Sequence, residues 1–96
     1  MEIYVFARMH ARPGMRQELY DAMYVVQGPT RKEIGCLGYG GFQSALDPDE
    51  FYIHSHWQDM VAFESHAQQP HTVMFVAAVE KLVDHPFKVT LGTKLW

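Results

Sequence analysis

Hydrophobic and polar residues alternate in four segments of the chain, and each segment predicts a strand. In residues 2–11, aliphatic side chains alternate with larger aromatic or basic ones: Ile3, Val5, Ala7 and Met9 against Tyr4, Phe6, Arg8 and His10. Alternation with a period of two is typical of β-structure. The same pattern predicts strands over 51–57 and 87–95. Residues 36–45 predict a further strand, whose glycines at 38, 40 and 41 indicate a bulge.

Two regions between these strands have the spacing of helices. After Met15, apolar residues recur on one helix face at Leu19, Ala22, Met23 and Val26. Gly28-Pro29 predicts the end of this helix, and Thr30 with Glu33 predicts a capping box for one short extra turn.

The second helical region begins after Asp59, a predicted N-cap, and is interrupted at residues 68–70. It resumes at His71 and continues to about Asp84. This last helix has so few polar positions that we expect it to be almost wholly enclosed.

The resulting order, β-α-β-β-α-β, is that of the ferredoxin-like split βαβ unit. We therefore expect an α+β fold with an antiparallel four-stranded sheet, in one domain spanning residues 1–96, because two cores would each be too small. The first and third strands carry large side chains on both faces, but two helices cover only one face. A homodimer formed through the other face follows as a prediction.

Composition narrows the classes of partner. A net charge of −3 gives no electrostatic reason to bind nucleic acid. No apolar run approaches the roughly 20 residues of a membrane span, and the first residues lack the pattern of a secretory signal, so we expect a cytoplasmic protein. The single cysteine, Cys36, is expected to be a small buried hydrophobe.

Six histidines are the first candidates for chemistry, since histidine changes charge near neutral pH. His66 and His71 flank the break in the second helical region, where a pocket mouth can form. Trp57 and Tyr39 could line the same cavity, although both also suit a core. His54 and His56 project from one side of a strand, and with His10 they form a weaker alternative, a metal site, on a face that a subunit interface explains equally well.

Several segments, in order and spacing, resemble the antibiotic biosynthesis monooxygenase (ABM) domain family. They are Arg12-Pro13-Gly14 after the first strand, the E-x-G-C-x-x-Y pattern from Glu33 to Tyr39, Phe51-Tyr52-Ile53 leading to Trp57-Gln58-Asp59, and H-x-x-x-P-H from His66 to His71. The resemblance covers nearly the whole chain.

The resemblance implies a dimeric α+β barrel with one pocket in each subunit. It also implies oxidation of a quinol, an anthrone or a similar electron-rich aromatic by molecular oxygen, without flavin, haem or metal. By resemblance, His66 and His71 would act as base or anion-stabilising groups, and Trp57 and Tyr39 as walls or oxyanion donors. Arg8 would anchor an anion, and Phe63 and Phe75 would contact the substrate.

The chain departs from the family pattern at informative positions. Ser55 stands two residues before Trp57, where the family often carries a glutamate, which removes one candidate base. The chain has no asparagine, and His66 occupies the place of a helix tryptophan, which disfavours haem degradation. The scaffold also occurs in isomerases of small signalling molecules and in proteins without demonstrated catalysis, so a non-catalytic ligand-binding dimer and an isomerase stay open as alternatives.

Overall fold

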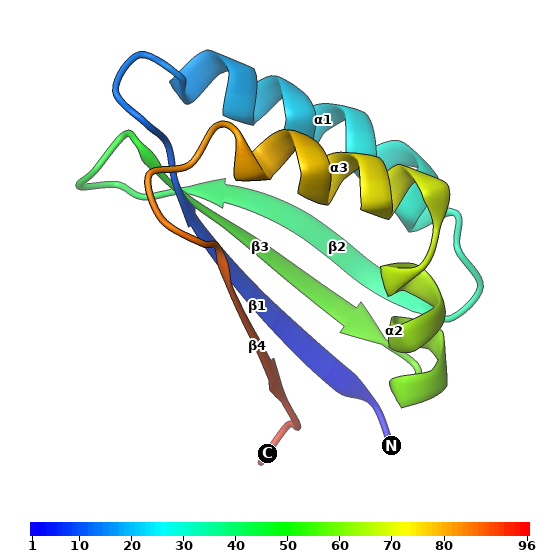
Figure 1. Ribbon diagram of the computed structural model, residues 1–96. Helices are drawn as coiled ribbons and strands as arrows, with labels where there is room; N and C mark the ends of the chain where they lie inside the picture. Colours follow the sequence, from blue (N-terminus) through cyan, green and yellow to red (C-terminus); the bar gives the residue numbers. More distant parts are fainter.

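A computed structural model describes residues 1–96 and has the predicted element order. The elements are β1 (Ile3–His10), α1 (Arg16–Arg31), β2 (Cys36–Gln43), β3 (Glu50–Trp57), α2 (Met60–Ala67), α3 (Pro70–Glu80) and β4 (Lys88–Gly92). Helices α1 and α3 lie side by side over one face of the sheet, and α2 lies at one end of that layer (Figure 1). None of the helices is long and apolar enough to cross a lipid bilayer. The predicted ferredoxin-like α+β fold is confirmed.

The sheet has the strand order β2-β3-β1-β4, and every neighbouring pair is antiparallel. Ser55 of β3 is the register partner of both Tyr39 on β2 and Val5 on β1. Because side chains in register point to the same face, these three residues form one row beneath the helices. The predicted glycine bulge is present as a register shift between Cys36 and Gly38. Strand β4 is shorter than the predicted 87–95 segment.

The two faces of the sheet differ in what covers them. Odd-numbered residues of β1 and β3 face the helices, and the buried ones are Val5, Ala7, Met9, Phe51, Ile53, Ser55 and Trp57. The even-numbered residues form the opposite surface, which we call the open face: Tyr4, Phe6, Arg8 and His10 of β1, and Glu50, Tyr52, His54 and His56 of β3. Nothing in a single chain covers this face, so the two-sided pattern of the sequence is present in the structure.

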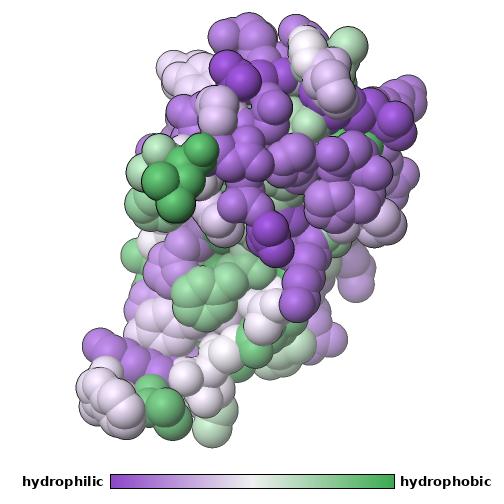
Figure 2. Space-filling model, turned by 90° about the vertical axis from the view of Figure 1, so that its left-hand side faces the viewer, coloured by the Kyte–Doolittle hydropathy of each residue, from purple (hydrophilic) through white to green (hydrophobic).

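The end of the molecule that carries the turn before α1 and the loop before β4 has a mixed surface. In the view onto that end, the helical half is mostly hydrophilic, whereas hydrophobic residues are more frequent in the lower half, towards the sheet (Figure 2). Trp96, at the end of the chain, is 94% exposed. The distribution agrees with a core that lies only between the helices and one face of the sheet.

Helix α1 continues through Gly28-Pro29, so the predicted stop there is wrong. Proline lacks an amide hydrogen, but in the last turn this forfeits only one backbone hydrogen bond. Thr30 is fully buried, and its hydroxyl donates to the Val26 carbonyl at 2.7 Å, which ties this turn to the one before it. The hydroxyl is thereby engaged within the helix, and the predicted capping box with Glu33 does not form. Glu33 is free to make other contacts.

Helix α3 is less enclosed than predicted. It ends at Glu80, and its buried residues are Thr72, Phe75 and Val79. Val73 and Met74 are 55% and 72% exposed, because only one face of the helix meets the sheet and α1. The predicted N-cap of α2 is confirmed, since Asp59 accepts a hydrogen bond from the Ala62 amide at 2.8 Å.

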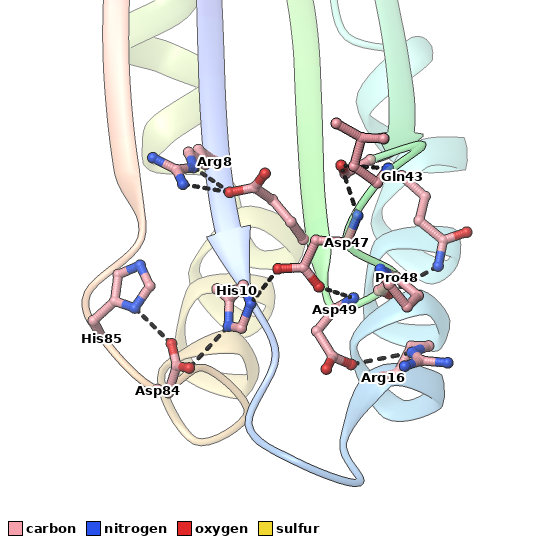
Figure 3. Close-up of polar contacts among 12 residues, drawn as sticks. Arg8, His10, Arg16, Gln43, Asp47, Pro48, Asp49, Asp84 and His85 are labelled. Carbon is pink, nitrogen blue, oxygen red and sulfur yellow. Dashed lines mark hydrogen bonds and ion pairs between the residues drawn. The ribbon is translucent and has the colours of Figure 1, made fainter.

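A polar cluster joins three segments at the loop end of the sheet (Figure 3). The His10 ring lies 2.8 Å from Asp47 through Nε2 and 2.8 Å from Asp84 through Nδ1. Asp84 also contacts His85, and Arg16 contacts Asp49. Strand β1, the β2–β3 turn and the loop before β4 are therefore held together by one imidazole between two carboxylates.

We predict that this cluster makes stability depend on pH. Hydrogen bonds to Asp47 and Asp84 raise the pKa of His10, so its contribution is complete below its ordinary value of 6.5 and is lost as pH rises through the raised pKa. The pKa of Asp47 is lowered, first by the Asp49 amide and then by His10. Burial acts to raise the pKa of Asp84, but its contacts with His10 and His85 together outweigh burial and lower it. The carboxylates contribute fully above their ordinary value of 3.8.

Thermal unfolding of wild type and His10→Gln should therefore differ most between about pH 4 and pH 6.5, and the difference should shrink at pH 9. His85→Gln, which removes the more exposed histidine of the cluster, is the control and should show a smaller difference. An equal change in Tm for His10→Gln at pH 5.5 and pH 9 would contradict the prediction.

The turn between α1 and β2 is set by Gly35. Its φ of +88° lies in the region that favours glycine, and a Cβ there would lie 2.6 Å from the Ala62 Cβ on α2. Its carbonyl accepts a hydrogen bond from Gln58 at 2.8 Å. The absence of a side chain thus lets the turn that carries Glu33 pack directly on α2.

Gly35→Ala should lower the free energy of unfolding by about 2 kcal/mol, from backbone strain and the clash with Ala62 together. Gly28→Ala is the matched control, because a Cβ at this helical position meets nothing within 4 Å. The control should be stabilising by about 0.5–1 kcal/mol. Urea denaturation measures both, and equal stabilities for the two variants would refute this account of the turn.

Candidate functional site

A cavity of about 170 Å³ lies between the sheet and helices α2 and α3. Ten of its lining residues are apolar: Val5, Ala7, Val26, Ile53, Phe63, Ala67, Phe75, Val76, Phe87 and Val89. The other four are Tyr39, Ser55, His66 and Thr72. The cavity is therefore an apolar space with a small set of polar groups, which is the usual composition of a small-molecule site.

The polar groups of the cavity belong to one cluster. Tyr39 and Ser55 are register partners on β2 and β3, and the Tyr39 ring lies edge-on to the His66 ring at 6.4 Å. The Thr72 hydroxyl is 3.3 Å from His66 Nδ1. Three groups, from two strands and one helix, thus lie around His66.

Glu33 connects His66 to the second predicted histidine. Its Oε2 lies 2.8 Å from His66 Nδ1 and 2.7 Å from His71 Nε2. The side chains are 10%, 12% and 22% exposed for Glu33, His66 and His71 respectively. A largely buried carboxylate is therefore shared by two imidazoles, one from α2 and one from α3.

This contact fixes the proton on His66. A carboxylate only accepts hydrogen bonds, so Nδ1 of His66 carries the hydrogen that it donates to Glu33. In the neutral ring, Nε2 then has a free lone pair, and no group of the protein is hydrogen-bonded to it. The arrangement is that of a general base oriented by an acid, as in a catalytic triad.

Glu33, His66 and His71 are also a combination that could ligate a metal, because their three ligand atoms lie within 4.8 Å of one another. Tetrahedral zinc with ligands at 2.0–2.1 Å places neighbouring ligand atoms about 3.3 Å apart. The two contacts of Glu33, at 2.8 and 2.7 Å, are hydrogen bonds as the residues stand. The three residues therefore form a hydrogen-bonded network.

Trp57 packs against the residues of the site from outside the cavity. It is fully buried, its ring lies 4.5 Å from the His66 ring, and its Nε1 donates to the Ser55 hydroxyl at 3.0 Å. Because the indole nitrogen is a donor only, Ser55 is the acceptor and keeps its own proton to donate. Trp57 does not line the cavity, and its contacts orient two residues that do.

Tyr39 remains a neutral donor. Burial raises the pKa of its hydroxyl far above the ordinary value of 10.0, nearby Cys36 and Glu33 add to the rise, and Arg31 opposes it. The Arg31 guanidinium donates to the Tyr39 carbonyl at 2.8 Å, which holds the backbone of β2 in place. A phenol that resists ionisation can donate a hydrogen bond to an anion in the cavity.

Only some of the other predicted site residues line the cavity. Phe63 and Phe75 line the cavity, His71 reaches it only through Glu33, and Arg8 does not reach it. Arg8 lies on the open face, where it is paired with Glu50. A role for Arg8 as an anion anchor in this cavity does not fit that position.

The alternative metal residues are not brought together. His54 and His56 are opposite Phe6 and Tyr4 on β1, whereas His10 is opposite Glu50 at the far end of the strand. Both ring nitrogens of His10 already contact carboxylates, and the His56 ring is stacked on Tyr4 at 4.1 Å. The geometry contradicts a three-histidine site on this face.

Sequence reasoning missed Glu33 as a site residue and interpreted it as part of a capping box. One signal was available, since Glu33 begins the E-x-G-C-x-x-Y pattern that ends at Tyr39. In the fold, the first residue of this pattern holds His66 and the last lines the cavity beside it.

Comparison with known proteins agrees with this fold. The family model described as "Antibiotic biosynthesis monooxygenase" matches residues 2–78. The Mycobacterium tuberculosis protein named "Putative monooxygenase Rv0793" is 32% identical over 87 residues, which cover 91% of this chain and 85% of that protein.

Solved structures give the same result. The structure of Rv0793 superposes with a TM-score of 0.95 at 29% identity, covering 99% of this chain and 96% of that one. The Pseudomonas aeruginosa protein PA3566 superposes with a TM-score of 0.92 at 28% identity, covering 99% and 95%. From the match over most of its length, the chain belongs to the antibiotic biosynthesis monooxygenase family.

Proposed function

We propose that the protein is a monooxygenase that oxidises a quinol, an anthrone or a similar electron-rich aromatic with molecular oxygen and without flavin, haem or metal. The observation that carries this proposal is His66, which is oriented by Glu33 and faces an apolar cavity with the neutral donors Tyr39 and Ser55 beside it. Family membership supports monooxygenase chemistry in general.

The first step is removal of a proton from the substrate. A phenol or enol in the cavity gives its proton to Nε2 of His66, and Glu33 stabilises the imidazolium that forms. The hydroxyls of Tyr39 and Ser55 donate hydrogen bonds to the substrate oxygen as it becomes negative. The apolar walls lower the local polarity around these groups, which strengthens the interactions.

The anion then supplies the electrons that a cofactor supplies in other oxygenases. One electron passes to oxygen, and the superoxide and substrate radical combine to form a carbon–oxygen bond. The peroxide takes the proton held by His66 and loses water as the carbon becomes a carbonyl. For an anthrone, substrate and one oxygen molecule give a quinone and one water, so atoms and electrons balance.

Oxygen consumption tests this function. With a panel of anthrones, quinols and other electron-rich phenols such as catechols, wild type should take up oxygen with at least one member, and His66→Ala should reduce kcat by roughly 10²–10⁴-fold through loss of the base. Glu33→Gln should cost less, since the ring nitrogen remains but its proton position is no longer fixed. An oxygen electrode, with and without chelator, gives the rates.

His85→Ala is the control, because this exposed histidine lies outside the cavity. A rate unchanged in the double variant His66→Ala/His71→Ala would remove both histidines from the mechanism. Binding without oxygen uptake would favour a ligand-binding dimer or an isomerase.

We also propose that a second copy of the chain covers the open face. Phe6 on the open face is 52% exposed, and Phe42 of β2, the register partner of Tyr52, is 56% exposed beside it. The rings of Tyr4, His54 and His56 form a stack across β1 and β3. A contiguous aromatic surface of this kind is typical of a protein interface. The resemblance to dimeric α+β barrels agrees with two such sheets face to face.

Sedimentation should show a dimer at micromolar concentration, and Phe6→Glu should shift it towards monomer, because an isologous contact buries the introduced charge twice. Val25→Glu, on the exposed side of α1, is the control and should leave the dimer intact. A wild-type monomer under these conditions would overturn the proposed assembly.

A further inference from the structure

We infer that the substrate is a single aromatic ring whose oxygen substituents lie on one edge, a catechol or monophenol with an apolar opposite edge. This inference rests on the proposed function and narrows it, because polycyclic anthrones and 1,4-quinols are then poor ligands. Two properties of the cavity carry it, namely its size and the uneven distribution of its polar groups.

The cavity has room for about one ring. Its volume is close to 170 Å³, and an apolar cavity of about 150 Å³ in another protein holds benzene. Three fused rings exceed this space, so part of such a ligand would lie outside the cavity, beside the half-exposed Val89. The part outside makes fewer contacts with the protein, which lowers affinity.

The polar groups occupy one side of the cavity. Tyr39 and Ser55 are on β2 and β3, and His66 and Thr72 meet them from above. The side over β1 and β4 offers only apolar atoms, from residues such as Ala7 and Val89, which are register partners. A ligand with a hydroxyl at each end of the ring would place one of them against this apolar side, where no protein group offers it a hydrogen bond, which weakens binding.

The polar side matches two adjacent oxygens. Ser55 accepts from Trp57 and donates its own proton, Tyr39 donates, and His66 Nε2 accepts. A catechol gives one proton to His66 and places its oxyanion between the two donors, while the second hydroxyl stays on the same edge. The opposite carbon edge then contacts the apolar side.

Two isomers test the inference, because 4-methylcatechol and methylhydroquinone have the same atoms and differ in where the hydroxyls lie. Calorimetry without oxygen measures binding without turnover. We expect wild type to bind 4-methylcatechol at least tenfold more tightly than methylhydroquinone. Anthrone should bind more weakly than 4-methylcatechol, although it is the more apolar ligand.

Variants of the cavity should change this order. Val89→Thr replaces a methyl by a hydroxyl on the apolar side and should reduce the preference between the isomers to about threefold or less. Val73→Thr is the control, since Val73 is exposed on α3 and lies outside the cavity. Phe63→Ala removes a half-buried ring on α2 and so enlarges the cavity. This variant should bind anthrone at least tenfold more tightly than the wild type.

The outcomes separate this inference from the proposed function. Catechol preference without later oxygen uptake would support the inference and contradict the monooxygenase. Oxygen uptake with anthrone, together with equal binding of the two isomers, would overturn the inference and leave the monooxygenase standing. No binding of either isomer to the wild type would also overturn the inference.

Discussion

The carboxylate of Glu33 joins the three parts of the chain on which the site depends. It comes from the turn between α1 and β2, and it accepts hydrogen bonds from one histidine on α2 and one on α3. A charge at 10% exposure needs such partners, since removing the partner of a buried charge destabilises a protein by about 3–5 kcal/mol. Glu33 has two such partners, so a variant that lacks one histidine leaves the carboxylate hydrogen-bonded to the other. The stability of the fold therefore does not depend on His66 alone.

The two faces of the sheet differ in the residues they carry, although the same strands form both faces. Odd-numbered residues of β1 and β3 form the core and the cavity, and even-numbered residues form the aromatic open face. Arg8 lies on the open face, paired with Glu50. A period of two keeps the candidate site apart from the face that we propose to meet a second copy, because a side chain on one face cannot reach the other.

The sequence allowed the fold to be predicted because alternation and helical spacing are local properties. The order of strands and helices along the chain, the break at residues 68–70 and the Asp59 cap all follow from residues that are close together in the sequence. Helix α1 continues beyond its predicted end because the buried Thr30 hydroxyl donates a hydrogen bond to the Val26 carbonyl in the preceding turn. The burial of Thr30 cannot be predicted from its sequence neighbours. His66, Tyr39, Phe63 and Phe75 were placed near a cavity, whereas Glu33 was missed, since its partners lie 33 and 38 residues further along the chain.

The departure at Ser55 also has a physical explanation in the site. A glutamate at this position would lie in the same row as Tyr39 and Val5, within an apolar cavity for which we propose His66 as the base. A second carboxylate there would be buried without a cation and would repel the developing substrate anion. Serine instead accepts from Trp57 and donates towards the cavity. The proposed base, His66, and the proposed donor, Ser55, are thereby separate residues, and each is oriented by its own partner, Glu33 for His66 and Trp57 for Ser55.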